Sequence, residues 1–134
     1  MKSLILAIAV LATLCFATDF YDEYGRKAGS SKTQKNQTQY YDEYGRRTGS
    51  TQYGEKSAKH YDEYGRNTGS TRFQGNMAQF YDNYGRKTGS SQTSGNTTKY
   101  YDEFGRNTGS AVKMSNGDID YYDKYGRKTG SSRH

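Results

Sequence analysis

The chain lacks most of the residues that build an ordinary globular core. Its 134 residues include no proline and no tryptophan, and its single cysteine is Cys15. Leucine is absent after residue 17, where the only Met, Val or Ile residues are Met77, Val112, Met114 and Ile119. A domain of this size normally folds by burying a contiguous apolar core, so aromatic side chains would have to supply nearly all of it. A thick two-layer core is therefore disfavoured.

Residues that carry enzyme chemistry are also scarce. The only histidines are His60, at a position where the other copies of the repeat described below have an aromatic residue, and the C-terminal His134. Two such histidines form neither a metal site nor a catalytic dyad, and the serines and threonines have no base to activate them. Recurring Asp-Glu pairs lack the alternating oxygen ligands of a calcium loop. We therefore expect a protein that is not an enzyme and has no catalytic residues, no cofactor and no metal.

The aliphatic residues are concentrated at the N-terminus. Lys2 precedes an apolar stretch from Leu4 to Phe16, and Cys15 and Ala17 place small residues at positions −3 and −1 before Thr18. This pattern is typical of a cleaved secretory signal, and the stretch is too short for a transmembrane helix of about 20 residues. We expect residues 1–17 to be removed, leaving a chain without cysteine or a transmembrane segment. The protein would be exported to the periplasm, the cell surface or the extracellular space.

Residues 18–134 contain six tandem copies of Tyr-Asp-x-Tyr/Phe-Gly-Arg-x-Thr/Ala-Gly-Ser, with a period of 20 residues that lengthens to 21 before the last copy. A fixed period of this size indicates an array whose units pack on their neighbours. The opening tyrosines are Tyr21, Tyr41, Tyr61, Tyr81, Tyr101 and Tyr122, and the aspartates that follow them are Asp22, Asp42, Asp62, Asp82, Asp102 and Asp123. The first glycines are Gly25, Gly45, Gly65, Gly85, Gly105 and Gly126, and the arginines after them are Arg26, Arg46, Arg66, Arg86, Arg106 and Arg127.

The local chemistry of each copy predicts a β-hairpin. Asp, two variable residues and Gly match a type I turn in which the glycine can adopt a positive φ, and β-favouring aromatic residues and threonine flank it. Gly75-Asn76, Gly95-Asn96 and Asn116-Gly117 are second turns between copies, with Lys35-Asn36 and Gly54-Glu55 at the equivalent places. We expect an all-β fold, an antiparallel hairpin repeat array of about a dozen strands that forms a meander or a solenoid-like sheet. A partly disordered chain is the alternative.

Two known repeat families resemble this unit. Tyr41-Asp42-Glu43-Tyr44-Gly45-Arg46-Arg47-Thr48 and its equivalents resemble the YD repeat of Rhs-type proteins, which implies exported β-hairpin repeats. The aromatic pair, Asp-x-x-Gly turn and Thr-Gly are also similar to the choline- and glucan-binding repeats of surface proteins, which have close to 20 residues. The tryptophans of that second family are absent, so the likeness concerns its hairpin.

The repeated tyrosines and arginines are the candidate contact surface. Equivalent side chains two strands apart form rows along a sheet, and such rows can bind a polymer through many weak contacts. We therefore predict a multivalent module that binds an envelope glycan or another surface polymer. The alternative is a tyrosine-rich structural or adhesive matrix protein that self-associates. The chain has a net charge of +6, but its lysines and arginines are interspersed with aspartates and glutamates. This mixture of charges disfavours a nucleic-acid surface.

Overall fold

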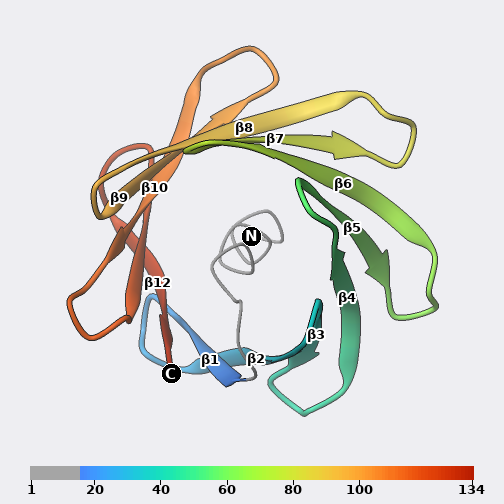
Figure 1. Cartoon of the computed structure of the whole chain (residues 1–134). Coiled ribbons are helices and arrows are strands. Elements are labelled where there is room, and N and C mark those ends of the chain that lie inside the picture. The colour runs from blue at the N-terminus through green and yellow to red at the C-terminus, as the bar shows by residue number, and fades with distance from the viewer. Residues whose placement is uncertain (1–15) are drawn as a thin grey trace.

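A computed structural model describes residues 16–134, which form twelve antiparallel strands in chain order. Each strand pairs with its sequence neighbours, and β1 pairs with β12, so the sheet closes into a barrel (Figure 1). The strands are β1 Phe16–Asp22, β2 Lys27–Gln34, β3 Gln37–Asp42, β4 Arg47–Tyr53, β5 Ser57–Asp62, β6 Asn67–Gln74, β7 Met77–Asp82, β8 Lys87–Ser94, β9 Thr97–Asp102, β10 Asn107–Lys113, β11 Ile119–Asp123 and β12 Lys128–Arg133.

The predicted all-β hairpin meander is confirmed. The structure also shows that the meander closes into a barrel, which the sequence did not predict. Each repeat contributes two strands, joined by the Asp-x-x-Gly turn at one rim of the barrel. Spacer turns join successive repeats at the other rim, and all of them are shorter than the Asp-x-x-Gly loops except residues 114–118 between β10 and β11. Closure removes the two free edges that an open meander would leave to pair with other chains. Most of the predicted signal, residues 1–15, lies outside the described residues, and Phe16 and Ala17 belong to β1.

A β-bulge recurs at the same place in every repeat. In the first hairpin Phe20 pairs with Gly29 and Tyr21 pairs with Lys27, so Ala28 is the additional residue. The equivalent register shift occurs in each of the other hairpins that carry an Asp-x-x-Gly turn. A bulge bends its strand and increases the local twist. Six equally spaced bulges therefore supply the curvature that bends a twelve-stranded sheet into a ring.

The second glycine of each copy allows neighbouring repeats to approach closely. A Cβ placed on Gly49 would lie 2.5 Å from the carbonyl oxygen of Tyr61 in the next copy. The same contact occurs in all six copies, with hypothetical Cβ-to-oxygen distances of 2.4–2.5 Å. Any side chain at these positions would therefore overlap the backbone of the following repeat, which explains why glycine recurs there.

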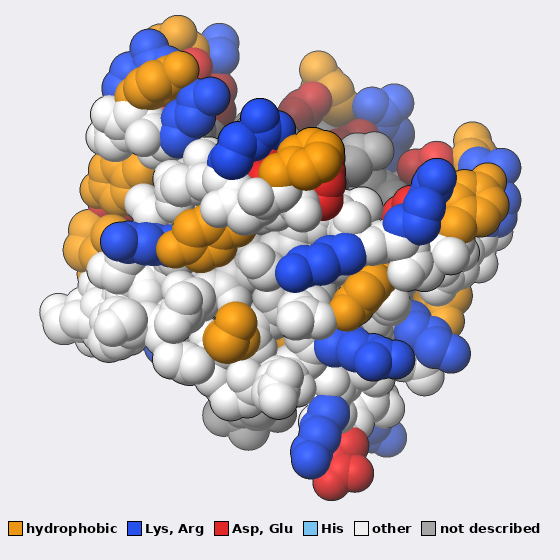
Figure 2. All heavy atoms as spheres, turned by 90° about the horizontal axis from the view of Figure 1, so that it is seen from above, with side chains coloured by type: hydrophobic (Ala, Val, Ile, Leu, Met, Phe, Trp, Pro, Cys, Tyr) orange, Lys and Arg blue, Asp and Glu red, His pale blue; other side chains and the backbone are white. Residues whose placement is uncertain are grey.

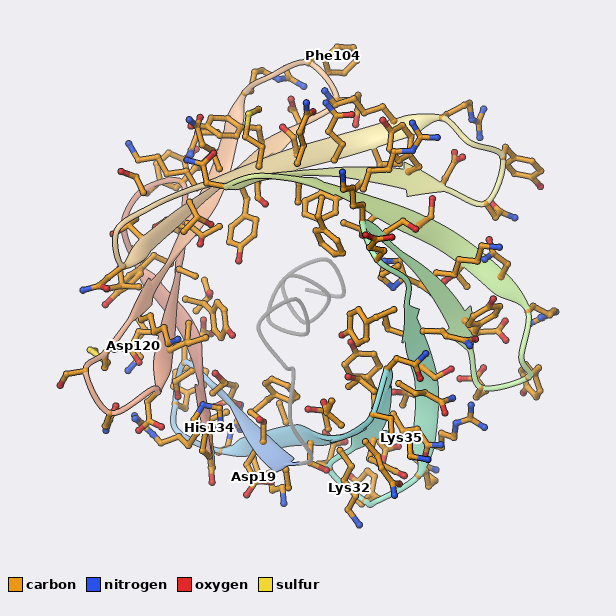
Figure 3. All side chains as sticks on the ribbon, in the orientation of Figure 1. Asp19, Lys32, Lys35, Phe104, Asp120 and His134 are labelled. Atoms are coloured by element: carbon orange, nitrogen blue, oxygen red, sulfur yellow. The ribbon has the colours of Figure 1, made fainter. Side chains whose placement is uncertain are left out.

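Side chains that point into the barrel are small or aromatic. Threonines, serines and alanines alternate with buried rings along the strands, and Figure 3 shows many of these side chains directed inward. Tyr100, Ala111, Ile119 and Tyr121 pack as one cluster, and the half-buried Phe80 lies against it. The aromatic residue just before the opening tyrosine thus supplies most of the large buried side chains, as expected for a chain with so few aliphatic residues. These buried residues are Phe20, Tyr40, His60, Tyr100 and Tyr121.

Candidate functional site

The Asp-x-x-Gly turns form six nearly identical tips at one rim of the barrel. In the first turn the Gly25 amide donates to the Asp22 carbonyl at 3.0 Å, and the Asp22 amide donates to the Arg26 carbonyl at 2.9 Å. Gly25 has φ of 79°, a left-handed conformation that glycine adopts without steric cost. The other five turns repeat both bonds within 0.1 Å. The predicted aspartates and first glycines therefore all lie in turns.

Each aspartate side chain fixes its tip through three hydrogen bonds. Oδ1 of Asp22 accepts the backbone N–H groups of Tyr24 and Arg26, both at 2.9 Å, and Oδ2 accepts Nε–H of Arg26 at 2.8 Å. The backbone N–H of Arg26 is the largest cause that holds the pKa of Asp22 below its usual value, and the Arg26 side chain adds to it. The same bonds recur in every copy, so the carboxylate holds the arginine in one orientation.

The oriented arginine lies against the aromatic ring two residues before it. The guanidinium carbon of Arg26 is 5.0 Å from the centroid of the Tyr24 ring, and the six equivalent distances are 5.0–5.2 Å. A guanidinium over a ring is a cation–π arrangement. The aromatic side chains are 71–76% exposed and are Tyr24, Tyr44, Tyr64, Tyr84, Phe104 and Tyr125. We call each exposed ring with its arginine and aspartate a tip.

The six tips project outward around the barrel. In Figure 1 the hairpin ends extend away from the ring of strands, and Phe104 lies at the outer end of its loop in Figure 3. Figure 2 shows orange side chains beside blue ones on separate projections at its upper edge. One molecule therefore presents six copies of the same small surface rather than one continuous patch.

The six-residue hairpin ends that carry the tips have almost no net charge. Residues 22–27, 42–47, 62–67, 82–87, 102–107 and 123–128 together contain eleven Lys or Arg and ten Asp or Glu. Elsewhere in residues 18–134 there are eight Lys or Arg and four Asp or Glu. The basic character of the protein therefore resides mainly outside the tips, on the strands and the spacer turns.

The structure separates the two predicted rows of the contact surface. All six predicted arginines lie at the tips, whereas the opening tyrosines stand half-buried on the outer wall. There the Tyr41 hydroxyl donates to Oε1 of Gln39 at 2.7 Å, and the Lys32 ammonium lies 6.0 Å from the Tyr41 ring. Tyr81 has the equivalent contacts with Gln79 and Arg72. Tyr41 and Tyr81 are thus engaged with a glutamine of their own strand and a cation of the neighbouring strand.

The exposed ring of each tip is absent from the predicted contact surface. The prediction treats the fourth residue of the motif as a variable turn position, although that residue is Tyr or Phe in all six copies. Exposed turn positions usually hold Gly, Pro, Asn, Asp or Ser. An aromatic residue at a polar turn position in six copies of six was the signal that could have identified it.

His60 is part of a hydrogen-bonded network on the inner wall. Its Nδ1 lies 2.9 Å from Oγ1 of Thr51, and its Nε2 lies 2.8 Å from Oγ1 of Thr71. Thr51 also contacts the Tyr40 hydroxyl at 3.2 Å. Burial lowers the pKa of His60 to about 4. The residue is therefore a neutral buried bridge between two strands at neutral pH.

Within residues 16–134, no three His, Cys, Asp or Glu side chains gather as a metal ion would require. The same residues contain no helix that is long and apolar enough to cross a membrane. Comparison of the chain with protein-family models and with curated proteins finds no match. The arrangement of the tips is therefore the basis for any functional conclusion.

Proposed function

We propose that this protein is an exported, non-enzymatic module that binds a glycan or similar polymer of the cell envelope through its six tips. The observation that carries the proposal is the sixfold repetition of one exposed ring, held with its arginine in a fixed geometry. Tyrosine is enriched at binding interfaces because its ring is apolar and its hydroxyl is polar. The repetition of the tips around one rim suits a ligand that is itself repetitive.

Multivalency accounts for how such small surfaces could bind usefully. A single ring and guanidinium offer little contact area, and each tip alone would bind weakly. Once one tip is engaged, the others meet the same polymer at a high effective concentration, which can raise the overall affinity by about 10² to 10⁴. The aspartate of each tip fixes the arginine before binding, which lowers the entropy that the ligand contact must overcome.

The chemistry of a tip favours an uncharged or weakly charged ligand. Its flat ring can stack on the apolar face of a sugar ring, and the guanidinium Nη–H groups can donate to hydroxyl oxygens. The Asp22 carboxylate already compensates the charge of Arg26 at 2.8 Å. Nucleic-acid binding depends on neutralising many phosphates with unpaired cations, and the near-neutral tips do not provide them.

A binding series on insoluble glycans tests this function. Purified protein is incubated with peptidoglycan, chitin or cellulose, and bound protein is measured across concentrations at low and high salt. Replacing two, four and then six tip rings by serine should weaken binding stepwise, with little effect of salt. Exposed wall residues supply the control variants Gln52→Ala and Lys59→Ala. Equal binding by wild type and the six-ring variant to every glycan would refute the proposal.

Self-association into a matrix is the second candidate function. Five of the six exposed tip rings are tyrosines, and exposed phenols on different molecules can stack or couple oxidatively. Sedimentation velocity across a concentration series, with dityrosine fluorescence after oxidation, separates the two candidates. Concentration-dependent assembly that is lost in the six-ring variant, together with absent glycan binding, would favour the matrix role.

A further inference from the structure

A cavity opens on the inner wall at the end of the barrel opposite the tips. Its volume is about 410 Å³, which is within the range of small-molecule sites in proteins. It is lined by strands β6 to β10 and by two spacer turns. Its central lining residues are Phe73, Ala78, Phe80, Thr93, Thr98 and Lys113. None of them belongs to a tip.

The repeats around this cavity differ from those on the other side of the barrel. Tyr53 accepts a hydrogen bond from Thr38, and His60 bridges two threonines. The residues at the same positions of the next repeat are Phe73 and Phe80, whose rings have no polar group to satisfy. Both phenylalanines are only half-buried although they face inward. The wall here thus presents apolar ring surface that the protein itself leaves partly uncovered.

Lys113 brings a cation to the same cavity. It pairs across the ladder with Ile119, and directly paired residues point to the same face of a sheet. Ile119 is buried in the inner cluster, so Lys113 is on the inner face as well. Its ammonium forms no ion pair of 4.0 Å or less with any residue in the described part of the chain. The equivalent residues of the preceding repeats are Thr33, Tyr53, Phe73 and Thr93, none of which is charged.

Two hydroxyls complete the lining. Oγ1 of Thr93 lies 2.8 Å from Oγ1 of Thr98, and this single bond uses one of the two hydroxyl protons. The second proton remains available to donate to an oxygen acceptor in the cavity. Apolar rings, one cation and one free hydroxyl donor are complementary to a flat apolar molecule that carries an acidic group.

We propose that this cavity is a binding site for a small aromatic carboxylate. The apolar body lies against Phe73, Ala78 and Phe80, and the carboxylate pairs with the Lys113 ammonium and accepts from the Thr93–Thr98 pair. The site is independent of the tips and of the polymer proposed for them. A polymer bound at the tips and a carboxylate bound in the cavity would occupy opposite ends of the barrel.

Isothermal titration calorimetry of the purified full chain with 2-naphthoate tests the site, with the uncharged 2-naphthamide as the matched probe. Wild-type protein should bind 2-naphthoate more tightly than the amide. Lys113→Gln should weaken 2-naphthoate binding about fivefold, the size expected for one partly exposed ion pair, and leave the amide unchanged. Phe73→Thr, which installs the residue of two other repeats, should weaken both probes.

Two controls make the result decisive. Lys99→Gln removes a cation from the outer wall and should change neither affinity, and circular dichroism verifies that each variant retains its strands. The proposal is overturned if 2-naphthoate fails to bind wild type, or if it binds Lys113→Gln and Phe73→Thr as tightly as wild type. Retained glycan binding in Lys113→Gln would show that a failure at the cavity leaves the tip function standing.

Discussion

Gly130 of the last repeat lies against Tyr21 of the first in the same way that Gly29 lies against Tyr41. A Cβ on Gly130 would be 2.5 Å from the Tyr21 carbonyl oxygen, and a Cβ on Gly29 would be 2.5 Å from that of Tyr41. The pairing of β1 with β12 thus repeats the contact that joins each of the five pairs of copies that follow one another in the sequence. Six copies form a ring in which each repeat has two equivalent neighbours.

The second glycine of each copy should be far less replaceable than the first. Gly49→Ala introduces a Cβ that overlaps the Tyr61 backbone and should lower the free energy of unfolding by about 3 kcal/mol, as overpacking does. Gly45 has φ of 81° and open space around its Cα, so Gly45→Ala should cost only about 1 kcal/mol of backbone strain. Urea unfolding measures both. A larger loss for Gly45→Ala would contradict this view of the repeat contact.

The spacer turns offer a stabilising substitution. Lys35 has φ of 58°, whereas Gly75 and Gly95 occupy the equivalent positions with φ of 59° and 61°. A side chain in this region costs about 1–2 kcal/mol of stability. Glycine removes that cost, but it also increases the conformational entropy of the unfolded chain, which offsets part of the gain. Lys35→Gly should therefore raise the free energy of unfolding by about 0.5–1 kcal/mol. The reciprocal Gly75→Lys should lower it, and thermal unfolding of both variants measures the pair.

His60 should make the barrel less stable in mild acid. Its pKa is about 4 in the folded chain and about 6.5 when unfolded, so the unfolded state binds the proton more readily. The stability associated with neutral His60 is complete above pH 6.5 and declines as the pH falls toward 4, by at most about 3 kcal/mol. His60→Tyr, which installs the residue found at Tyr40 and Tyr100, should remove this decline. Unfolding titrations between pH 7 and pH 4 would reveal it, and an unchanged slope in the variant would contradict the assignment.

The tip aspartates should affect the stability of the barrel at a lower pH than His60 does. Hydrogen bonds, first from the backbone N–H of the arginine, hold the pKa of Asp42 and its five equivalents below the usual value of 3.8. Their contribution is present above pH 3.8 and is lost as the pH falls through the lowered values. Asp42→Asn should make this acid loss shallower because one of six groups no longer titrates.

The same variant distinguishes the two roles of the aspartate in the turn, as a negative charge and as a hydrogen-bond acceptor. Asn can still accept the two backbone N–H groups but no longer pairs with the charge of Arg46. Stability at pH 7 should therefore fall less in Asp42→Asn than in Asp42→Ala, which loses all three bonds. Circular dichroism and urea unfolding at pH 7 compare the two variants. Equal losses would indicate that the charge, rather than the acceptor, holds the turn.

The strands and turns were predictable because their signals are local. Asp-x-x-Gly and Gly-Asn specify turns, and the intervening residues favour strands, so the hairpin meander followed from one repeat unit. Closure was not predictable, because it depends on the bulge at Ala28 and its equivalents and on the pairing of Tyr21 with Ser131, far along the chain. The predicted arginines lie at the tips, but the exposed ring at Tyr24 was passed over. Its relation to Arg26 depends on the orientation that the Asp22 side chain imposes, which residue types alone do not specify.

The pairing of β1 with β12 also means that the chain ends could lie at other junctions of the ring without changing which strands are paired. Every junction between successive copies uses the same glycine-to-backbone contact, and the first and last strands are adjacent. A circularly permuted gene that joins these strands through a short linker and opens another spacer turn would preserve every strand pairing. The exposed ring of a single copy could likewise be replaced without altering any strand pairing, so the six copies can be tested one at a time.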